Sequence, residues 1–243
     1  MDEEAELYPL SVMDIACGKG GDIPKWQIAR IRNLYGFDLS LVSLNKAKKR
    51  KLETRFCSFY ARFIEENACV DPKNFFERVE EEVYFDIVSC QFALHYMLKS
   101  EQTARNFFEN ISRKLVKGGY FISTHPDANV IVQKLRKQGK QDEKGRTFVK
   151  NDYYSIISPT TEFSNKSIFG HLYGFFLDND LVGKKDESDK VCVLEYVSEY
   201  LIIVDELAKI AADYDLKIVK SQNFHDFYAK NIKKPEHFTL FKK

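Results

Sequence analysis

The sequence predicts an α/β fold built around a mostly parallel sheet with helices on both faces. Short apolar runs alternate with helical patterns from Ser11 to about Lys137, as in successive βαβ units. The first apolar run, 11–17, leads into a glycine-rich turn at 18–21, and Asp22 and Pro24 then suit the start of a helix. This order of strand, glycine turn and helix is typical of a nucleotide-type site at the carboxyl edge of a parallel sheet.

The second apolar run ends at Asp38, about 20 residues after Gly18, where an acid can bind both hydroxyls of a ribose. A dinucleotide-binding fingerprint requires a third glycine at the start of the helix, and Ile23 stands there instead. The turn therefore indicates a nucleoside-containing ligand other than a dinucleotide.

The remaining elements follow in order along the chain. Ser40 is expected to cap a second helix, and Ser100 a later one, because serine accepts a hydrogen bond from a free N–H of the first turn. The run 84–92 has the continuous apolar character of a central parallel strand and leads into a loop, 93–96, at the same edge as the glycine turn. Further strands are predicted at 57–64, 120–124, 217–221 and 238–242, and further helices at 23–32, 72–82, 127–136 and 197–214.

The region 138–190 interrupts this pattern. It is largely polar and contains one aromatic island at 170–177. Long insertions in α/β folds often cover the substrate. We therefore expect a single domain, 1–243, in which the insertion forms part of a lid.

Composition narrows the function classes. A chain of 243 residues with 44% apolar residues can bury one sizeable core, and its formal net charge of +1 argues against a protein that simply coats nucleic acid. A basic cluster at 46–51 is most simply a solvated helix face; binding of phosphate or an import factor is the alternative. No C-x-x-C pair or histidine spacing indicates a metal site, and no signal peptide or membrane-length apolar run is present. We expect a soluble protein of a reducing intracellular compartment.

Several motifs together resemble the eukaryotic and viral messenger-RNA cap guanine-N7 methyltransferases. An acid two residues before a short glycine turn is itself similar to the first motif of S-adenosylmethionine-dependent methyltransferases. The matching motifs cover nearly the whole chain in the right order: D-I-A-C-G-K-G-G-D (14–22), Y-G-F-D (35–38), S-C-Q-F-A-L-H-Y (89–96), G-G-Y-F-I (118–122), G-H-L-Y (170–173), V-S-E-Y-L (197–201) and F-H-D-F-Y (224–228). The resemblance implies a class I methyltransferase (Rossmann-like) fold with a seven-stranded sheet, and methylation of the RNA cap at N7.

The resemblance also implies two sets of site residues. The cofactor, S-adenosyl-L-methionine, would be bound by Asp14, Ala16, Gly18, Asp38, Asn67, Gln91 and Tyr96. The cap would be contacted by Lys19, Asp22, Arg50, His95, Tyr173 and Glu199. Four of these residues have a simpler alternative, in which Asp14 is a plain cap of the turn, Gln91 satisfies loop backbone, His95 is structural and Tyr173 packs in the core.

The sequence departs from the family pattern at three points. Ala16 stands where the family's turn usually begins with glycine, and Asn67 stands where the family has an acid for the adenine amine. The amide oxygen of Asn67 can still accept that hydrogen bond. A lysine that lies over the cofactor in the family, before the first strand, has no counterpart in this sequence.

The predicted chemistry needs no catalytic base, because guanine N7 attacks with a neutral lone pair and no proton has to be removed first. Catalysis would come from proximity, alignment and a field that favours positive charge on the base. Glu199 is the most informative candidate, since a carboxylate can accept from guanine N1–H and the exocyclic amine together. Glu195 and Glu206 are its nearby rivals.

Two other function classes stay open from the residues. One is a methyltransferase that acts on a small molecule. Lys19, Arg50 and the basic helix argue against this class, because they favour a phosphorylated acceptor. The other is a catalytically silent RNA-binding or partner-binding scaffold, to which Ala16 and Asn67 lend support. The preferred hypothesis implies a capped RNA 5′ end as partner, a capping-apparatus subunit or activator, and a nuclear location, or the cytoplasm for a viral protein.

Overall fold

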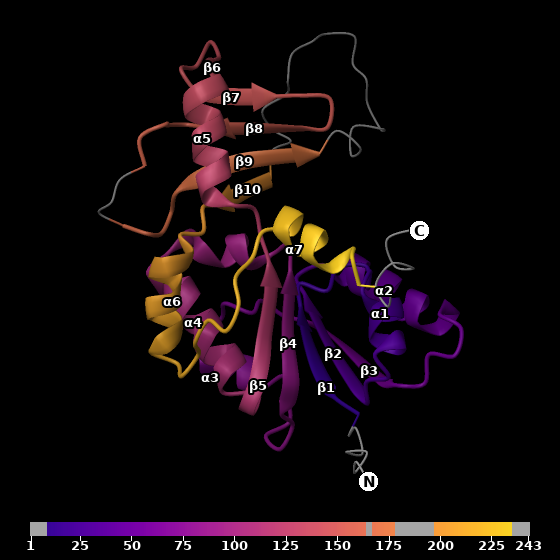
Figure 1. Cartoon of the computed structure of the whole chain (residues 1–243). Helices are drawn as coiled ribbons and strands as arrows, with labels where there is room; N and C mark the ends of the chain where they lie inside the picture. The colour runs from indigo at the N-terminus through magenta and orange to yellow at the C-terminus, as the bar shows by residue number, and fades with distance from the viewer. Residues whose placement is uncertain (1–8, 164–166, 178–196, 235–243) are drawn as a thin grey trace.

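The computed structural model describes residues 9–163, 167–177 and 197–234, which form two sheets (Figure 1). The parallel sheet has the order β3-β2-β1-β4-β5. Its strands are β1 (Ser11–Ile15), β2 (Asn33–Asp38), β3 (Tyr60–Glu65), β4 (Phe85–Gln91) and β5 (Leu115–Thr124). This arrangement confirms the predicted α/β class with a parallel central sheet.

Helices cover both faces of the parallel sheet. On one face the apolar residues of β1 and β2 pack against α1 (Ile23–Ile28) and α2 (Leu41–Glu53). On the other face they pack against α3 (Pro72–Phe76), α4 (Glu101–Ser112) and α6 (Val204–Ala212). Side chains alternate between faces along a strand, so Val12 faces the first core and Met13 the second. The strands predicted in this half are present, but those expected at 57–64 and 120–124 span 60–65 and 115–124. The helices expected at 23–32 and 72–82 are shorter than predicted and end at Ile28 and Phe76.

The two predicted serine caps are present. Ser40 accepts a hydrogen bond from the N–H of Ser43 at 3.2 Å, and Ser100 forms a capping box with Thr103. Between β4 and α4 lies η1 (Leu94–Lys99), a short 3₁₀ segment that carries His95 and Tyr96.

The second sheet is antiparallel and has the order β10-β9-β8-β7-β6. Its strands are β6 (Lys140–Gln141), β7 (Thr147–Lys150), β8 (Tyr154–Ser158), β9 (Leu172–Leu177) and β10 (Val197–Tyr200). Helix α5 (Ala128–Gln138) packs on one face through Ile131 and Leu135. In Figure 1 this sheet stands beyond the carboxyl ends of the parallel strands, and α7 (Phe224–Asn231) lies across the same edge.

Two predicted elements, the helix at 197–214 and the strand at 217–221, are wrong. The helix expected at 197–214 is instead β10 followed by α6, because 197–200 pairs with β9 as an edge strand. No strand is present at 217–221, and the strand predicted at 238–242 lies outside the described residues. In the part that the structure describes, the parallel sheet therefore has five strands, rather than the seven expected. The described helices include none that is long and apolar enough to span a membrane.

Asn110 fastens a loop at the carboxyl edge to the core. This residue of α4 is fully buried, and its side-chain amide donates to the carbonyls of Ala68 at 2.9 Å and Val70 at 3.0 Å. These carbonyls belong to the loop that follows β3 and carries Asn67. Asn106 of the same helix also donates its side-chain amide to this loop, to the carbonyl of Cys69 at 3.0 Å. Two side-chain amides of α4 therefore hold the loop in position, and that of Asn110 is the fully buried one.

We predict that Asn110→Leu lowers the free energy of unfolding by about 1–3 kcal/mol, because two buried carbonyls lose their donor. Urea unfolding followed by circular dichroism measures the change. Gln102→Ala is the matched control, since it removes an amide of the same helix that bonds to Asn106 at an exposed site. Equal stabilities of the Asn110 and Gln102 variants would contradict the assignment.

Candidate active site at the carboxyl edge

The glycine turn between β1 and α1 is shaped by three left-handed residues. Ala16, Gly18 and Gly20 have φ values of +54°, +53° and +71°. A Cβ on Gly20 would lie 2.5 Å from Ile23 Cδ1 and 3.1 Å from Ala47, so no side chain fits there. A Cβ on Gly18 would meet no atom within 4 Å, so this glycine borders open space.

Ala16 adopts the conformation that the turn requires without being glycine. A left-handed alanine costs roughly 1–2 kcal/mol more than a right-handed one. The departure from the family pattern therefore leaves the path of the turn intact and stores a small strain in it.

Asp38 ties the end of β2 to two neighbouring segments. Its Oδ2 accepts from the N–H of Gly18 at 2.9 Å, and its Oδ1 accepts from the N–H of Ser40 at 2.8 Å. Each carboxylate oxygen keeps a second lone pair. Asp38 therefore fixes the glycine turn and can still accept two hydroxyl donors.

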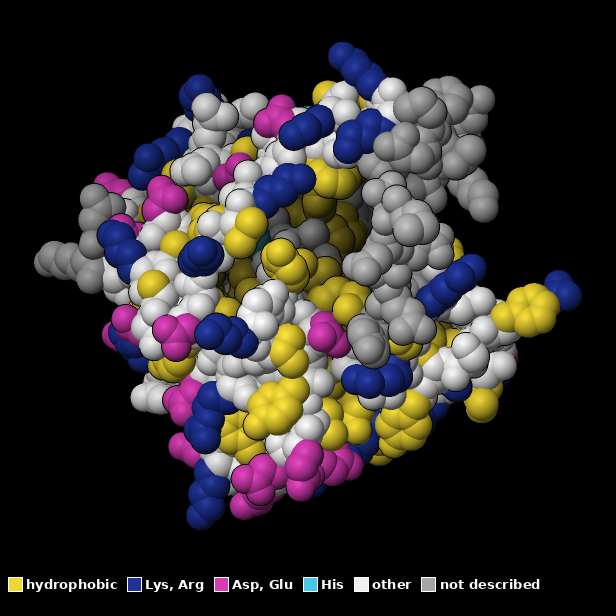
Figure 2. All heavy atoms as spheres, turned by 60° about the horizontal axis from the view of Figure 1, so that its bottom comes forward, with side chains coloured by type: hydrophobic (Ala, Val, Ile, Leu, Met, Phe, Trp, Pro, Cys, Tyr) yellow, Lys and Arg dark blue, Asp and Glu magenta, His cyan; other side chains and the backbone are white. Residues whose placement is uncertain are grey.

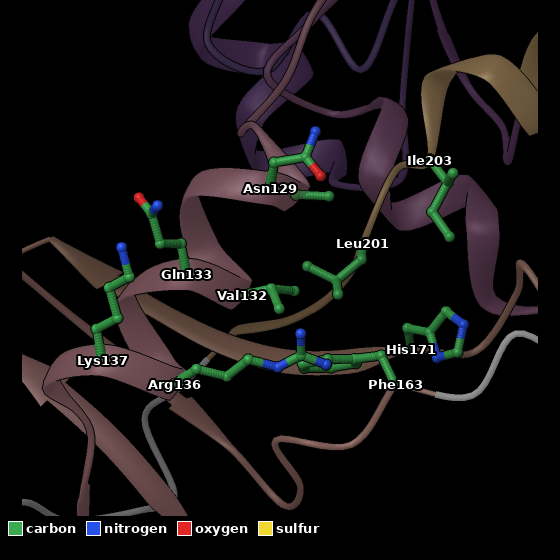
Figure 3. A pocket seen from close by; sticks show the side chains of 10 residues that line it. Asn129, Val132, Gln133, Arg136, Lys137, Phe163, His171, Leu201 and Ile203 are labelled. Carbon is green, nitrogen blue, oxygen red and sulfur yellow. The ribbon is translucent and has the colours of Figure 1, made fainter.

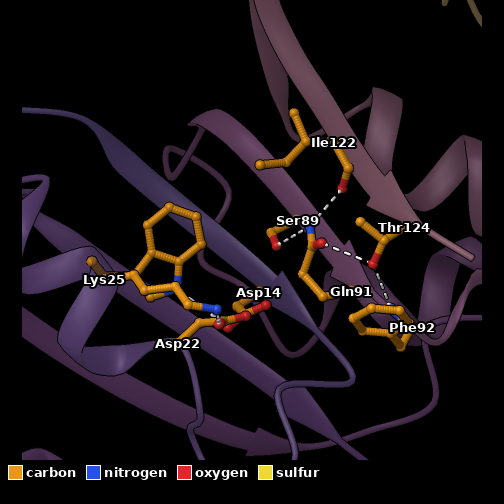
Figure 4. Close-up of polar contacts among 9 residues, drawn as sticks. Asp14, Asp22, Lys25, Ser89, Gln91, Phe92, Ile122 and Thr124 are labelled. Atoms are coloured by element: carbon orange, nitrogen blue, oxygen red, sulfur yellow. Dashed lines mark hydrogen bonds and ion pairs between the residues drawn. The ribbon is translucent and has the colours of Figure 1, made fainter. Parts of the chain in front are cut away.

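Asp14 is a buried acid under the turn. It is 4% exposed, and its Oδ2 lies 3.4 Å from the indole nitrogen of Trp26 (Figure 4). Burial raises the pKa of Asp14 to about 7, against weaker lowering by hydrogen bonds from Trp26 and Ser89. Among the described residues no lysine or arginine forms an ion pair with it. The site therefore suits a cationic ligand.

The other predicted cofactor residues are already engaged within the chain. The amide of Gln91 bonds to Ser89, to the carbonyl of Ile122 and to Thr124, at 3.1, 3.4 and 3.0 Å (Figure 4). The amide oxygen of Asn67 accepts from the N–H of Cys69 at 2.9 Å in a local turn. Gln91 thus satisfies one backbone carbonyl and two neighbouring hydroxyl groups, and the cofactor roles of Gln91 and Asn67 stay predictions.

The predicted acceptor residues meet around Glu199. Tyr173 lies opposite it in the β9–β10 pair and donates its hydroxyl to Oε2 at 2.5 Å. Tyr96 donates to Oε1 at 3.4 Å, and His95 Nε2 lies 3.4 Å from the same oxygen. Glu199, Tyr173 and His95 are 5%, 1% and 2% exposed. Residues about a hundred positions apart in the sequence thus form one cluster, which we call the Glu199 cluster.

The Glu199 cluster contains a carboxylate and a histidine that can accept or donate further hydrogen bonds. Neither ring nitrogen of His95 has a hydrogen-bond partner among the described residues. Burial, followed by the neighbouring Glu199, raises the pKa of Tyr96 to about 12 and that of Tyr173 further, so both hydroxyls stay protonated donors. Buried polar groups normally have partners, so an unpaired imidazole beside a carboxylate is typical of a ligand site. Tyr96, predicted as a cofactor residue, lies in this cluster.

Three predicted cap residues lie near the glycine turn. Lys19 and Arg50 are exposed, and a Cβ on Gly21 would lie 3.8 Å from Arg50 Nη1. Asp22 forms an ion pair with Lys25, so its carboxylate is already engaged. The side chains of Lys19 and Arg50 are thus two solvent-exposed cations beside the turn.

Sequence reasoning did not assign a role to two residues of this edge. Trp26 donates to Asp14, and Asn110 supports the loop of Asn67. Trp26 stands one helical turn after Asp22, on the α1 face that points to the sheet. An indole at that position was the available signal, because a buried indole N–H needs an acceptor.

The space-filling view shows a hollow with a largely hydrophobic floor and several lysine and arginine side chains around it (Figure 2). A separate cavity of about 440 Å³ lies between α5 and the segment after β10 (Figure 3). Its lining includes Arg136, Phe163, His171 and Leu201 and none of the predicted site residues. His171 and Leu201 lie two positions from Tyr173 and Glu199, so this cavity neighbours the Glu199 cluster.

Comparison with solved structures defines the class of protein. A methyltransferase from Streptomyces caelestis, CcbJ, aligns with a TM-score of 0.55 at 14% identity, over 87% of this chain and 74% of that one. An S-adenosylmethionine-dependent methyltransferase from Clostridium acetobutylicum aligns with a TM-score of 0.51 at 16% identity, over 86% and 74%. The chain has the fold of class I methyltransferases, with an antiparallel sheet inserted.

Sequence comparison identifies the family. The family of the mRNA (guanine-N(7))-methyltransferase domain matches residues 1–243. The mRNA cap guanine-N(7) methyltransferases 1 of rice and Arabidopsis thaliana are each 34% identical over 96% of this chain. The chain spans 60% of the length of both relatives. This protein belongs to the mRNA (guanine-N7)-methyltransferase family.

We predict that Asp14→Asn stabilises the ligand-free protein increasingly as pH rises. In the wild type the folded state retains a proton on Asp14 between the ordinary aspartate pKa of 3.8 and its raised pKa of about 7. The folded state therefore binds more protons than the unfolded state, so the stability from Asp14 is present below about pH 4 and is lost as pH approaches 7. The asparagine variant has no such loss, and its advantage should reach on the order of 3 kcal/mol at pH 8.

Urea unfolding of both proteins between pH 4 and pH 8 measures this difference. The exposed Asp152→Asn serves as control, because it removes a carboxylate that is not buried. A constant difference between Asp14→Asn and the wild type across this range would contradict the raised pKa.

Proposed function

We propose that this protein methylates the 5′ cap guanosine of mRNA at N7, with S-adenosyl-L-methionine as methyl donor. The observation that carries the proposal is the Glu199 cluster at the carboxyl edge of a methyltransferase sheet, a buried carboxylate beside a histidine that makes no hydrogen bond among the described residues. The cap guanine-N(7) methyltransferases of rice and Arabidopsis support the choice of acceptor.

The residues around the glycine turn fit the proposed cofactor. Gly18 borders open space, Asp38 can accept from two ribose hydroxyls, and the unpaired Asp14 suits an ammonium group. When bound, the cofactor supplies an electrophilic methyl group on a sulfonium sulfur. The turn and Asp38 then act by holding that group in a fixed direction.

The Glu199 cluster fits a guanine base. Each oxygen of Glu199 has a second lone pair for guanine N1–H and the exocyclic amine, while Tyr173 and Tyr96 keep the carboxylate in place. His95 can make a further contact to the base through a ring nitrogen that has no partner among the described residues. The negative charge of Glu199 favours the cationic 7-methylguanine, so it stabilises the product-like transition state.

No general base is assigned, because N7 attacks with a lone pair. In this proposal catalysis is positioning, with the cap's phosphate chain held by Lys19 and Arg50 beside the turn. We further propose that the antiparallel sheet is the acceptor lid, since it supplies Tyr173 and Glu199. A nuclear location, or a cytoplasmic one for a virus, and an activator or capping-apparatus subunit as partner belong to the same proposal.

Transfer of labelled methyl from S-adenosylmethionine to capped RNA and to triphosphate-ended RNA tests the function. Methylation of the capped RNA alone supports it. Transfer to neither RNA, together with binding of S-adenosylhomocysteine, favours a small-molecule acceptor. Absence of binding as well favours a silent scaffold.

We predict that Asp38→Ala weakens S-adenosylhomocysteine binding at least roughly tenfold, since charged hydrogen bonds contribute about 1.5–3 kcal/mol each. Calorimetric titration measures the affinity. Some stability is lost too, because Gly18 and Ser40 lose their acceptor. Asp127→Ala controls for this loss: Asp127 also accepts from two backbone N–H groups, of Asn129 and Val130. Similar affinities of the two variants would refute the ribose assignment.

We predict that Glu199→Gln lowers kcat/KM for the guanosine cap at least tenfold, equivalent to about 1.4 kcal/mol, while cofactor affinity barely changes. Glutamine keeps the volume but turns one acceptor into a donor facing the guanine amine, and it removes the negative charge. Steady-state kinetics with a cap dinucleotide measures the effect.

Glu206→Gln is the matched control, because Glu206 forms an ion pair with Lys209 on α6, away from the cluster. The other rival, Glu195, lies outside the described residues. If Glu206→Gln or Glu195→Gln is the damaging change and Glu199→Gln is silent, the guanine contact has been assigned to the wrong glutamate.

A further inference from the structure

Positive charge is concentrated in one short segment of the chain. Residues 46–56 contain six cations and a single acid, whereas the whole chain has a formal net charge of +1. The segment forms the second half of α2 and the loop after it. The cations are Lys46, Lys48, Lys49, Arg50, Lys51 and Arg55.

The first residues of this segment lie beside the glycine turn in space. Helix α2 packs under the turn, because a Cβ on Gly20 would lie 3.1 Å from Ala47. Arg50 reaches the neighbourhood of Gly21, and Lys46 lies one helical turn earlier on the same face. The basic face of α2 therefore adjoins the proposed position of the cap's phosphate chain.

An aromatic platform ends the same segment. Thr54 terminates α2 by donating its hydroxyl to the carbonyl of Arg50 at 2.8 Å. Phe56 then takes a left-handed conformation, φ +59°, and its side chain is 76% exposed. The guanidinium of Arg55 lies 4.7 Å from the ring centroid. A bulky residue in this region of φ is unfavourable, and such strain tends to occur at functional positions.

Two features of the segment are not expected of a helix face that is merely solvated. One is the exposed ring of Phe56 in a strained backbone conformation, and the other is the position of Arg50 beside the glycine turn. Cations along a path together with an exposed ring are the parts of a surface that binds single-stranded nucleic acid, where phosphates meet the cations and bases stack on the ring. The only ion pair of the cluster among the described residues joins Lys49 to Glu53, so the other cations remain available to phosphates.

We propose that Lys46, Arg50, Arg55 and Phe56 form a track for the first RNA nucleotides that follow the cap, with a base stacked on Phe56. The track rests on the proposed function, because the cap must occupy the Glu199 cluster for the chain to leave along α2. It gives the enzyme a higher affinity for a capped RNA than for a cap dinucleotide.

The test uses Phe56→Asn and Arg55→Gln. Asparagine tolerates the left-handed conformation, so the loop keeps its path. Lys117→Gln is the matched control, because Lys117 is exposed near the start of β5, at the opposite edge of the parallel sheet. Thermal unfolding verifies that all three variants are folded.

Binding of a labelled RNA of roughly a dozen nucleotides, capped or triphosphate-ended, is measured by fluorescence anisotropy at several salt concentrations. We expect Phe56→Asn to weaken binding of both RNAs about tenfold, as loss of one stacked base does. Arg55→Gln should reduce the slope of log K against log salt by about 0.7, for one released counterion on a single strand. KM for the cap dinucleotide should not change in either variant, and Lys117→Gln should change nothing.

RNA affinities equal to wild type in both variants would overturn the proposal. So would an equal loss for cap dinucleotide and RNA, because Phe56 and Arg55 would then serve the cap itself. Failure of the proposed function would give a different result. The wild type would then methylate no cap, while its binding of the triphosphate-ended RNA would still be weakened by Phe56→Asn. If the variants bind RNA normally but lose retention on an acidic polypeptide such as polyglutamate, the surface binds protein and the track is refuted.

Discussion

A carboxylate held out of water at Glu199 sets the chemistry of the acceptor side. Removing a charge from water is costly unless donors replace the lost solvation. Tyr173 and Tyr96 supply two donors, and His95 adds a polar ring that makes no hydrogen bond among the described residues. Such an arrangement is stabilised further when a ligand brings N–H groups. In the proposed function this capacity is what makes the cluster complementary to a base edge, whereas an ordinary buried ion pair has no free acceptor for a ligand.

The position of this carboxylate depends on how the two sheets meet. Strand β4 ends at Gln91, beside the glycine turn, and the chain then runs within a few residues into η1, which carries His95 and Tyr96. Strand β10 brings Glu199 onto the same 3₁₀ segment. One short stretch after β4 therefore links the cofactor edge to the acceptor cluster. Methyl transfer requires reacting atoms about 3–3.5 Å apart in line, so in the proposed function this short connection would set the distance between cofactor and acceptor.

The parallel half of the fold could be predicted from sequence because its signals are local. Apolar runs, serine caps and the glycine turn each act over a few residues, so Ser40, Ser100 and Asp38 were placed correctly. The antiparallel sheet could not be predicted in this way, because its strands are short and paired across long separations. The segment 197–214 shows the failure well. Its apolar spacing fits a helix, and only pairing with β9 makes its first four residues a strand.

The site residues were likewise predictable only where their signal in the sequence is local. Asp38 was indicated by its place after a strand, whereas Glu199 was indicated only by resemblance, since three glutamates lie close together in the sequence. Pairing opposite Tyr173 is what places Glu199 beside His95 and Tyr96, and that pairing is nonlocal. The partner of Asp14 was missed for a related reason. Trp26 packs with the core between α1 and the sheet, and nothing local in the sequence shows that its N–H meets a buried acid.

The cost of the site argues against a scaffold that has lost its ligands. Ala16 is held in a left-handed conformation, which costs roughly 1–2 kcal/mol, and Asp14 is a buried acid without a cationic partner in the described part of the chain. His95 adds a buried ring that lies 3.4 Å from Glu199 but makes no hydrogen bond among the described residues, at about 1–3 kcal/mol for such a group. Folded proteins have stabilities of only about 5–15 kcal/mol, and substitutions that relieve such strain are easily found. The strain at Ala16 belongs to the turn itself, whereas the costs of the buried Asp14 and His95 would be reduced by a bound cation and a bound polar group. Their presence together at one edge is explained most simply by ligands that supply a cation under the turn and donors at Glu199.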